Sequence, residues 1–381
     1  MRDLIFRGVH IRPVWRLPLL PDDGGRGAIG VLVAVLIGAG VLVGMGALVV
    51  DVGQIYQNRA ELQNGADASA LAVAKSCIEG TCTPSIATQY ADANASNLTS
   101  GTAGVYRVCG SPASLTGCPL STGQITDCPT AAAGANYVDV YTYTQLPNGS
   151  HLLPPIFART LAGNGSYQGS TVYACAQAEW GAPLTATGLG FTISACSWDV
   201  YTNLGQSFAA PPPYPPNPLP AASLDHMLKF HGQGSQAGCP PDEPSGADAP
   251  GNFGWTVDPS GNCTVTVTGN TYGVKTGTSA SPACKTALAN DYANKSIVYI
   301  PVYVSVTGTG ATAMYTLKGF AAFVVTGYRL PGTSATDWLN PANNCSGNAF
   351  CIDGYFTQGL IPSVGGVGGP NLGAYVVKLT G

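Results

Sequence analysis

The fold of this chain is decided by residues 28–50, AIGVLVAVLIGAGVLVGMGALVV, and by residues 51–77 after them, DVGQIYQNRAELQNGADASALAVAKSC. Residues 28–50 hold 23 consecutive positions without a charged or hydrogen-bonding side chain. At about 1.5 Å of rise per residue, a helix of this length crosses a hydrocarbon core of about 30 Å. Because backbone amides in lipid must find partners within their own segment, we predict one transmembrane helix over residues 28–50.

Charge on the two sides of this segment predicts how it is oriented. Residues 1–27 carry five arginines, whereas the basic side chains in the 25 residues after the segment are Arg59 and Lys75. Arginine and lysine concentrate on the cytoplasmic side of membrane helices. We therefore expect a single-pass protein of the cell membrane, with a basic cytoplasmic N-terminus (1–27) and an extracytoplasmic C-terminal region. A cleaved signal peptide, with Gly44-x-Gly46 as its cleavage site, is the alternative, but its apolar region normally spans about 7 to 15 residues.

Small residues recur at four-residue spacing within the apolar segment. Ala34 and Gly38 form one pair, and Gly40 and Gly44 form another. Such spacing lets a second helix approach closely in lipid. We expect these residues to pack against a helix of another membrane protein or of a second copy of this chain, which would make a homo-oligomer. Chance spacing in a segment rich in glycine and alanine is the alternative.

Residues 51–78 are predicted to continue the membrane helix outward as an amphipathic stalk. Apolar side chains recur there at steps of three and four residues, which is the spacing of one helix face. They are Val52, Ile55, Tyr56, Leu62, Ala66, Ala70 and Val73. The charged and amide side chains occupy other positions, where we expect a solvated helix face.

A run of specific residues surrounds and follows the apolar segment. It begins with Arg-Gly and continues beyond the segment with Asp-x-Gly, an aromatic residue, an arginine and Leu-Gln-Asn-x-Ala-Asp-Ala-x-Ala-Leu-Ala. These residues are Arg26, Gly27, Asp51, Gly53, Tyr56, Arg59, Leu62, Gln63, Asn64, Ala66, Asp67, Ala68, Ala70, Leu71 and Ala72. On these positions the chain resembles the N-terminal segment of the TadE/TadG-like Flp pilus-assembly proteins. It is similar, more loosely, to the outer region of actinobacterial members at residues 252–255, 300–303 and 319–330.

The resemblance implies a membrane-anchored structural or accessory component of a Flp/Tad-type pilus assembly system. Such a protein acts by protein–protein interaction, so the expected partners are the lipid bilayer and other pilus-assembly membrane proteins. One position departs from the pattern. Pilins and pseudopilins of this system carry a glutamate a few residues after the processed glycine, whereas Gly27 is followed by AIGVLV. We therefore expect the apolar segment to stay uncleaved and the protein to remain outside the fibre.

Beyond residue 78 the chain is predicted to be mainly β. Short runs with period-two alternation, separated by Gly, Pro, Asn and Ser, are typical of antiparallel sheets. The best candidates are residues 137–144, 171–178, 264–268, 297–307, 319–328 and 374–379. We expect two β-rich extracytoplasmic regions, 79–210 and 221–381, joined by the proline-rich residues 211–220 as a linker, because proline interrupts helices and central strands. A surface loop within one outer domain is the alternative reading of residues 211–220.

All twelve cysteines lie C-terminal to the apolar segment. An even number of cysteines on the outer side of a membrane points to an oxidising compartment and to disulfides. Full pairing does not follow from sequence, but close neighbours are the simplest candidates. They are Cys77 with Cys82, Cys263 with Cys284, and Cys345 with Cys351. The fold class is therefore a transmembrane helix, a stalk helix and a mainly β, disulfide-containing outer region.

Enzymatic and nucleic-acid-binding functions find little support. Residues 51–381 carry 11 basic and 17 acidic side chains without a basic cluster of the kind that binds phosphates. Common catalytic motifs are absent, and His226 and His231, five residues apart, do not converge on one ion from a helix or a strand. We expect no enzyme activity, cofactor or metal. A triad built from distant loops would use His226 beside Asp225 as its base.

The alternative function is an envelope-anchored cell-wall or glycan-binding module, or a hydrolase. Aromatic rings exposed on a β domain can stack on sugars. Trp198, Trp255 and Trp338 are the candidate rings. Burial in the core is the competing expectation for each of them.

Overall fold

The chain divides into two compact units in a computed structural model. The first unit comprises Met1–Gly53 and Pro155–Gln168, and the second comprises Gln54–Pro154 and Gly169–Gly381. The structure describes residues 26–38, 41–95, 102–119, 126–157, 168–230, 237–239, 253–258, 260–275, 279–308, 312–342, 345, 349–361 and 366–380.

The apolar segment that was predicted as one helix is divided between two, α1 (Arg26–Gly38) and α2 (Val41–Ile78). Residues 39–40 lie outside the described residues. Within the described ranges, none of the helices combines the length and the apolar character that a membrane crossing requires. The helix α2 is 38 residues long and includes every residue of the predicted stalk, 51–78.

The end of α2 is held by a turn and a disulfide. Gly80 adopts a φ of +85°, a left-handed conformation that glycine takes without steric cost. The amides of Thr81 and Cys82 donate to the carbonyl of Ser76 at 3.0 and 2.9 Å, and a disulfide joins Cys77 to Cys82. The chain then enters the short helix α3 (Ile86–Asn94).

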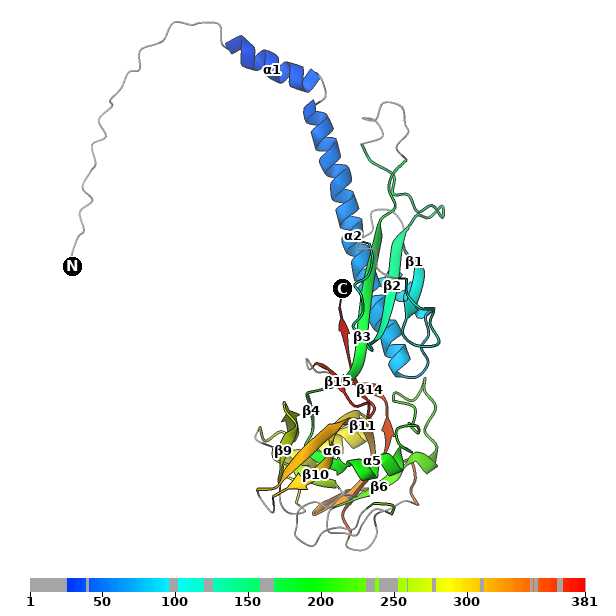
Figure 1. Ribbon diagram of the computed structural model, residues 1–381, viewed down its shortest axis with the longest axis vertical. Coiled ribbons are helices and arrows are strands. Elements are labelled where there is room, and N and C mark those ends of the chain that lie inside the picture. The colour runs from blue at the N-terminus through cyan, green and yellow to red at the C-terminus, as the bar shows by residue number, and fades with distance from the viewer. Residues whose placement is uncertain are drawn as a thin grey trace, which may run out of the picture. The chain divides into compact units, whose positions relative to one another are not determined.

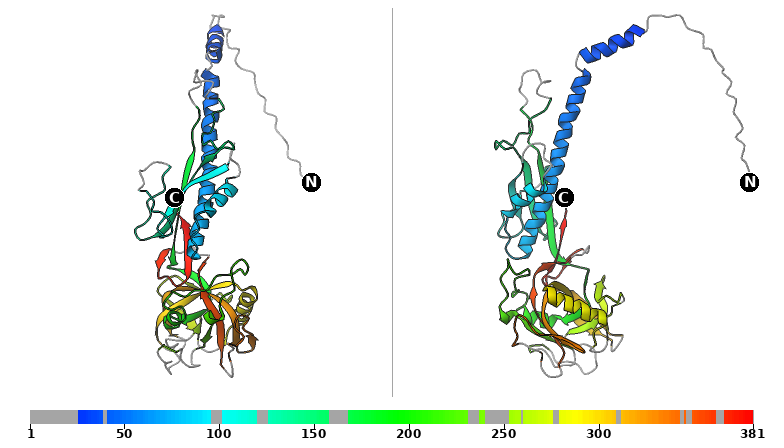
Figure 2. Two further views of the ribbon diagram at one scale, coloured as in Figure 1. Left: turned by 90° about the vertical axis from the view of Figure 1, so that its right-hand side faces the viewer. Right: turned by 180° about the vertical axis from the view of Figure 1, so that it is seen from behind.

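The first sheet lies against the C-terminal half of α2, as Figures 1 and 2 show. Its strands are β1 (Thr102–Gly110), β2 (Asn136–Gln145), β3 (Tyr173–Pro183), β16 (Ala374–Leu379) and β14 (Gly359–Leu360), in that order, with β15 (Val367–Gly369) also paired to β3. The pairs β1–β2, β2–β3 and β3–β16 are antiparallel, whereas β14 is parallel to β16. Strand β16 therefore brings the C-terminal part of the chain back beside β3, across about 200 residues of intervening sequence.

The intervening sequence builds a second sheet and a two-stranded ribbon within the same unit. The sheet order is β10 (Ile297–Thr307), β5 (Phe191–Ser194), β7 (Phe253–Thr256), β9 (Thr271–Lys275), β11 (Met314–Leu330), β13 (Cys351–Thr357) and β6 (His226–Lys229), with β12 (Thr333–Ala335) on β11 and a further β10–β11 pairing. The ribbon pairs β4 (Ala186–Leu189) with β8 (Thr264–Val267). Two helices, α5 (Ala195–Tyr201) and α6 (Pro282–Asn294), pack on this part, with a 3-10 turn, η1 (Ala222–Leu224), before β6.

The prediction of a long N-terminal helix followed by a mainly β region is confirmed, and all twelve cysteines form six disulfides. The six predicted runs fall within β2, β3, β8, β10, β11 and β16, extending one or two residues past them in β3 and β8. The helices α3, α5 and α6 were not predicted. The proline-rich residues 211–220 pack on β13, where the hydroxyls of Tyr214 and Tyr355 lie 2.6 Å apart.

Candidate functional site

One face of α2 is buried against the first sheet. Its contact residues are small or aliphatic, and they fit against the apolar side chains that β2 and β3 present on the same side. They are Ala66, Ala70, Val73, Ala74 and Ile78 on α2, and Val138, Val140, Ala176, Ala178 and Trp180 on the sheet. Small side chains allow the helix axis to lie close to the strands, because no long side chain separates the two backbones.

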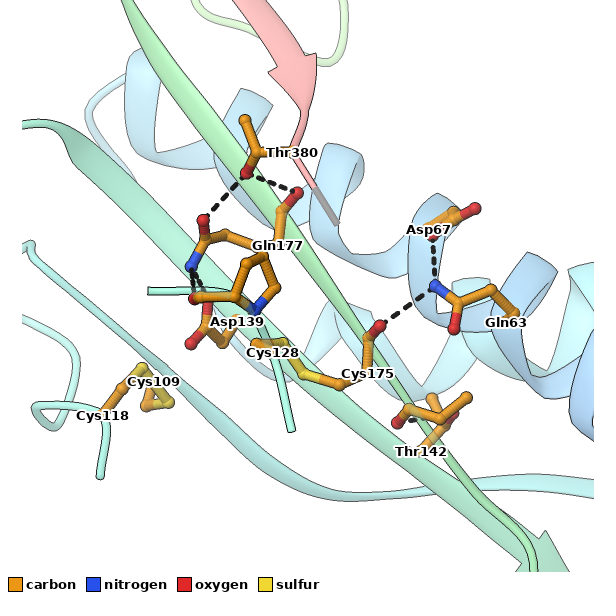
Figure 3. The surroundings of a disulfide bond; sticks show 12 residues. Gln63, Asp67, Cys109, Cys118, Cys128, Asp139, Thr142, Cys175, Gln177 and Thr380 are labelled. Carbon is orange, nitrogen blue, oxygen red and sulfur yellow. Dashed lines mark hydrogen bonds between the residues drawn. A yellow bond between two sulfur atoms is a disulfide. The ribbon is translucent and has the colours of Figure 1, made fainter. Parts of the chain in front are cut away.

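Polar residues of the family-like motif add hydrogen bonds to this contact. The side-chain amide of Gln63 donates to Asp67 Oδ1 at 2.9 Å and to the carbonyl of Cys175 on β3 at 3.0 Å (Figure 3). On β2, the hydroxyl of Thr142 donates to the carbonyl of Leu62 at 3.1 Å. Leu62 and Gln63 of the Leu-Gln-Asn-x-Ala-Asp motif therefore attach the helix to the sheet by hydrogen bonds, and the Leu62 side chain is fully buried.

Other motif residues are more exposed. Tyr56 is 71% exposed and Asn64 is also exposed, while Arg59 is half-buried. A tyrosine ring that remains in water on a long helix is available for contact with another molecule. The sequence reading missed two buried polar residues on α2, Asn58 and Ser69, whose side chains bond to backbone carbonyls.

Glycine is required where α2 meets α3. A Cβ atom on Gly65 would lie 2.6 Å from the carbonyl oxygen of Ala91. The hydroxyl of Ser69 donates across the same contact to the carbonyl of Ala87 at 2.8 Å. By contrast, a Cβ atom on Gly53 would meet nothing within 4 Å.

The first unit contains the Asp-x-Gly motif. The Asp51 carboxylate accepts the backbone amide of Ile156 at 2.8 Å and that of Phe157 at 3.1 and 3.2 Å from its two oxygens. In the same unit, Ala34 and Gly38 lie exposed on α1 and Gly44 lies half-buried on α2. Gly40, the fourth of the small residues predicted to pack against another helix, is outside the described residues.

Two disulfides lie on the sheet face that is opposite α2, Cys109–Cys118 and Cys128–Cys175 (Figure 3). Between them, Asp139 accepts the side-chain amide of Gln177 at 2.9 Å. Burial raises the pKa of Asp139 to about 6, against a smaller lowering by this hydrogen bond. Cys109, Cys118 and Asp139 place potential ligand atoms within 4.8 Å of one another. Because metals bind thiolates and both sulfurs are held in the disulfide, this cluster does not form a metal centre.

A group of aromatic rings covers the same face further along the strands. Tyr106 lies 5.6, 6.0 and 5.7 Å from the ring centroids of Tyr141, Tyr143 and Tyr173. The Tyr143 ring also lies 4.3 Å from the ring of His151. Tyr106 is the extra residue of a β-bulge between Val105 and Arg107, which places its ring among the others instead of in the β1 ladder. We call Tyr106, Tyr143, His151 and Tyr173 the tyrosine surface.

The tyrosine surface is partly open. Tyr106 is 48% exposed and Tyr173 is 37% exposed. With Thr126 the four residues line a cavity of about 370 Å³. Gly104 lies against the Tyr143 ring, because a Cβ atom there would be 2.4 Å from Cζ of Tyr143.

The tryptophans considered as sugar-stacking rings are core residues in two cases. Trp198 and Trp255 are 3% and 2% exposed. Trp338 is partly buried, and the Lys295 ammonium lies 4.3 Å above its ring. The competing expectation of burial therefore holds for Trp198 and Trp255, and sequence reasoning missed the exposed tyrosines.

The candidate triad base has a packing role. His226 stacks on the ring of Tyr201 at 4.4 Å between centroids, and burial lowers its pKa. Asp225 accepts the hydroxyl of Thr326 at 2.7 Å. His231 lies outside the described residues.

One buried carboxyl in the second sheet is strongly perturbed. Asp353 on β13 is nearly inaccessible, and burial, together with the charge of Asp337, raises its pKa to about 7. Asp337 accepts the amides of Leu339 and Asn340 at 2.8 and 2.9 Å. Asp337 therefore orders the loop at residues 339–340, whereas Asp353 is the carboxyl whose proton is lost only near neutral pH.

The fold and these contacts define a class of protein in which a long N-terminal helix carries a disulfide-bonded, mainly β region. Residues 27–76 match the family model of the putative Flp pilus-assembly TadE/G-like proteins. The resemblance identified from the motif is thereby confirmed over that range. Searches of curated proteins and of solved structures found no match.

Proposed function

We propose that this protein is a membrane-anchored structural or accessory component of a Flp/Tad-type pilus assembly system, and that it acts by protein–protein interaction without catalysis. The observation that supports this most is the TadE/G-like match over residues 27–76, whose motif attaches α2 to the first sheet. The tyrosine that this motif leaves exposed on α2 is the proposed contact for other pilus-assembly proteins.

The proposed anchor is the apolar segment 28–50. On α1 the side chains of Ile29, Val31 and Leu32 are exposed, and each loses contact with water when it enters lipid. Residues 1–27 would then be cytoplasmic and the region after residue 78 extracytoplasmic. Six disulfides support an oxidising compartment for that region.

Two finer features belong to the same proposal. The pairs Ala34 with Gly38 and Gly40 with Gly44 would pack against a neighbouring membrane helix, from a partner or a second copy. Since no carboxylate follows Gly27 within AIGVLV, the segment would remain uncleaved. If the mass of the mature protein corresponded to a chain that starts after Gly27, the prediction of an uncleaved segment would be contradicted.

The test is comparative co-purification from gently solubilised membranes of cells that express the pilus system. Wild type should recover other pilus-system membrane proteins, and Tyr56→Ala should recover less of them. Tyr90→Ala is the matched control, because Tyr90 is 44% exposed on α3. Equal recovery by the two variants would exclude Tyr56 as a contact, and a wild-type sample free of pilus proteins would contradict the function.

A second candidate function is glycan binding, which the tyrosine surface favours. Exposed aromatic faces stack on sugar rings, and tyrosine hydroxyls add hydrogen bonds. Sedimentation of the full chain with purified cell wall tests it. Tyr106→Ala should reduce the bound fraction while Tyr90→Ala leaves it unchanged, and absence of binding by wild type would remove this candidate.

A further inference from the structure

The Asp-x-Gly aspartate holds a loop that is distant in sequence. Asp51 is the first residue after the apolar segment, and it is 7% exposed. Its carboxylate accepts two consecutive backbone amides, those of Ile156 and Phe157, at 2.8 to 3.2 Å. These bonds hold the loop residues Ile156 and Phe157 beside the point on α2 where the apolar segment ends.

The loop residues held in this way expose apolar side chains. Ile156 is 51% exposed and Phe157 is 44% exposed, directly after two prolines in the sequence LLPPIF. On α2 the neighbours of Asp51 in sequence, Val50 and Val52, are exposed as well. Apolar side chains from two chain segments are thus partly exposed near one carboxylate, and such a patch marks a surface that contacts lipid or protein.

We infer that Ile156 and Phe157 insert into the outer boundary of the lipid bilayer beside the point where the apolar segment leaves it, with Asp51 as the positioning residue. The inference rests on the proposed anchoring of residues 28–50. Asp51 follows Val50 by one helical step of about 1.5 Å, so the two amides that it binds lie within a few ångströms of the end of that segment. Aromatic and aliphatic side chains are favoured at this depth.

The hydrogen bonds between Asp51 and the two loop amides lower the cost of placing both donor and acceptor near lipid. Backbone amides near lipid are costly without an acceptor, and a carboxylate near lipid is costly without donors. Here the Asp51 carboxylate is the acceptor for the amides of Ile156 and Phe157, and these amides are its donors. A protein partner would be an alternative cover for the patch, but continuity with the apolar segment favours lipid.

The test is photo-crosslinking of the full chain in nanodiscs of phosphatidylcholine and phosphatidylglycerol. A benzophenone amino acid replaces Phe157 in one sample and Val31, on α1, in another. We expect lipid adducts at both positions. An adduct at position 31 without a lipid adduct at position 157 would overturn the inference and leave the anchor intact. No lipid adduct at either position would contradict the anchor itself.

The role of the aspartate is tested in the same sample. Asp51→Ala should lower the lipid adduct at position 157 by roughly ten-fold, the loss expected when a charge-assisted hydrogen bond is removed. The adduct at position 31 should not change. Asp92→Asn is the control for loss of a carboxylate, since Asp92 is exposed on α3. An unchanged adduct at position 157 in Asp51→Ala would exclude Asp51 as the positioning residue.

Discussion

The contact between α2 and α3 can be tested with two glycine substitutions in one helix. Gly65→Ala places a methyl group 2.6 Å from the carbonyl oxygen of Ala91, and this oxygen belongs to the backbone, so the two helices must separate. Gly53→Ala adds the same methyl group where nothing lies within 4 Å. Both variants gain the same helix propensity, about 1 kcal/mol relative to glycine.

The difference between the two variants therefore isolates the steric cost at Gly65. Forcing an extra methyl group into a packed contact typically costs about 1 to 3 kcal/mol. Separation of the helices would also break the hydrogen bond from Ser69 to the carbonyl of Ala87. We expect Gly65→Ala to have a free energy of unfolding about 1 to 3 kcal/mol below that of Gly53→Ala.

The assay is denaturant unfolding of the full chain in detergent micelles, followed by far-ultraviolet circular dichroism. Limited proteolysis after α2 supplies a second readout, because a displaced α3 exposes the chain around it. If Gly65→Ala were as stable and as resistant to protease as Gly53→Ala, the close approach of the two helices would be refuted.

Three further predictions concern the second unit. Because the raised pKa of Asp353 means that the folded state binds its proton more tightly, the free energy of unfolding should fall as pH rises from 3.8 to about 7. Unfolding midpoints of Asp353→Asn should fall less steeply over this range, with the remaining slope coming from buried carboxyls such as Asp139. Replacing the Cys128–Cys175 pair by alanines should lower the unfolding free energy by roughly 4 kcal/mol, against roughly 2 for Cys77–Cys82, since their separations are 47 and 5 residues. Equal losses would show that loop entropy does not set their contributions. Gln63→Ala should cost about 1 kcal/mol in the same measurement through its lost bond to β3, whereas Asn64→Ala should be nearly neutral; the reverse order would contradict the observed helix face.

The sequence predicted well the elements whose apolar residues recur with a regular local period. Helical spacing identified α2, and period-two alternation identified strands such as β8, whose valines face the core and whose threonines do not. The strand β13 was not predicted, because all seven of its residues are buried and its sequence does not alternate between apolar and polar side chains. The helix α6 was missed although Ser281 caps it and Pro282 begins it, which are recognisable start signals.

The site residues depended more on long-range contacts. Nothing near Gln63 indicates a bond to Cys175, which lies 112 residues away, and nothing near Asp51 indicates the amides of Ile156 and Phe157. The tyrosine surface is likewise assembled from three strands, one of them bulged, and from the segment after β2 that carries His151. Sequence spacing shows which residues share a face of one element, but the pairing of elements decides what that face meets.

Membrane topology in intact cells tests the central proposal most directly. Cells are reduced and then treated with a maleimide that cannot cross membranes, and labelled cysteines are located by mass spectrometry. Labelling of cysteines beyond residue 76 without breaking the cells is expected if the arginine-rich end is cytoplasmic and the β region is outside. Labelling that appears only after the membranes are opened would contradict that arrangement and the proposed role in pilus assembly.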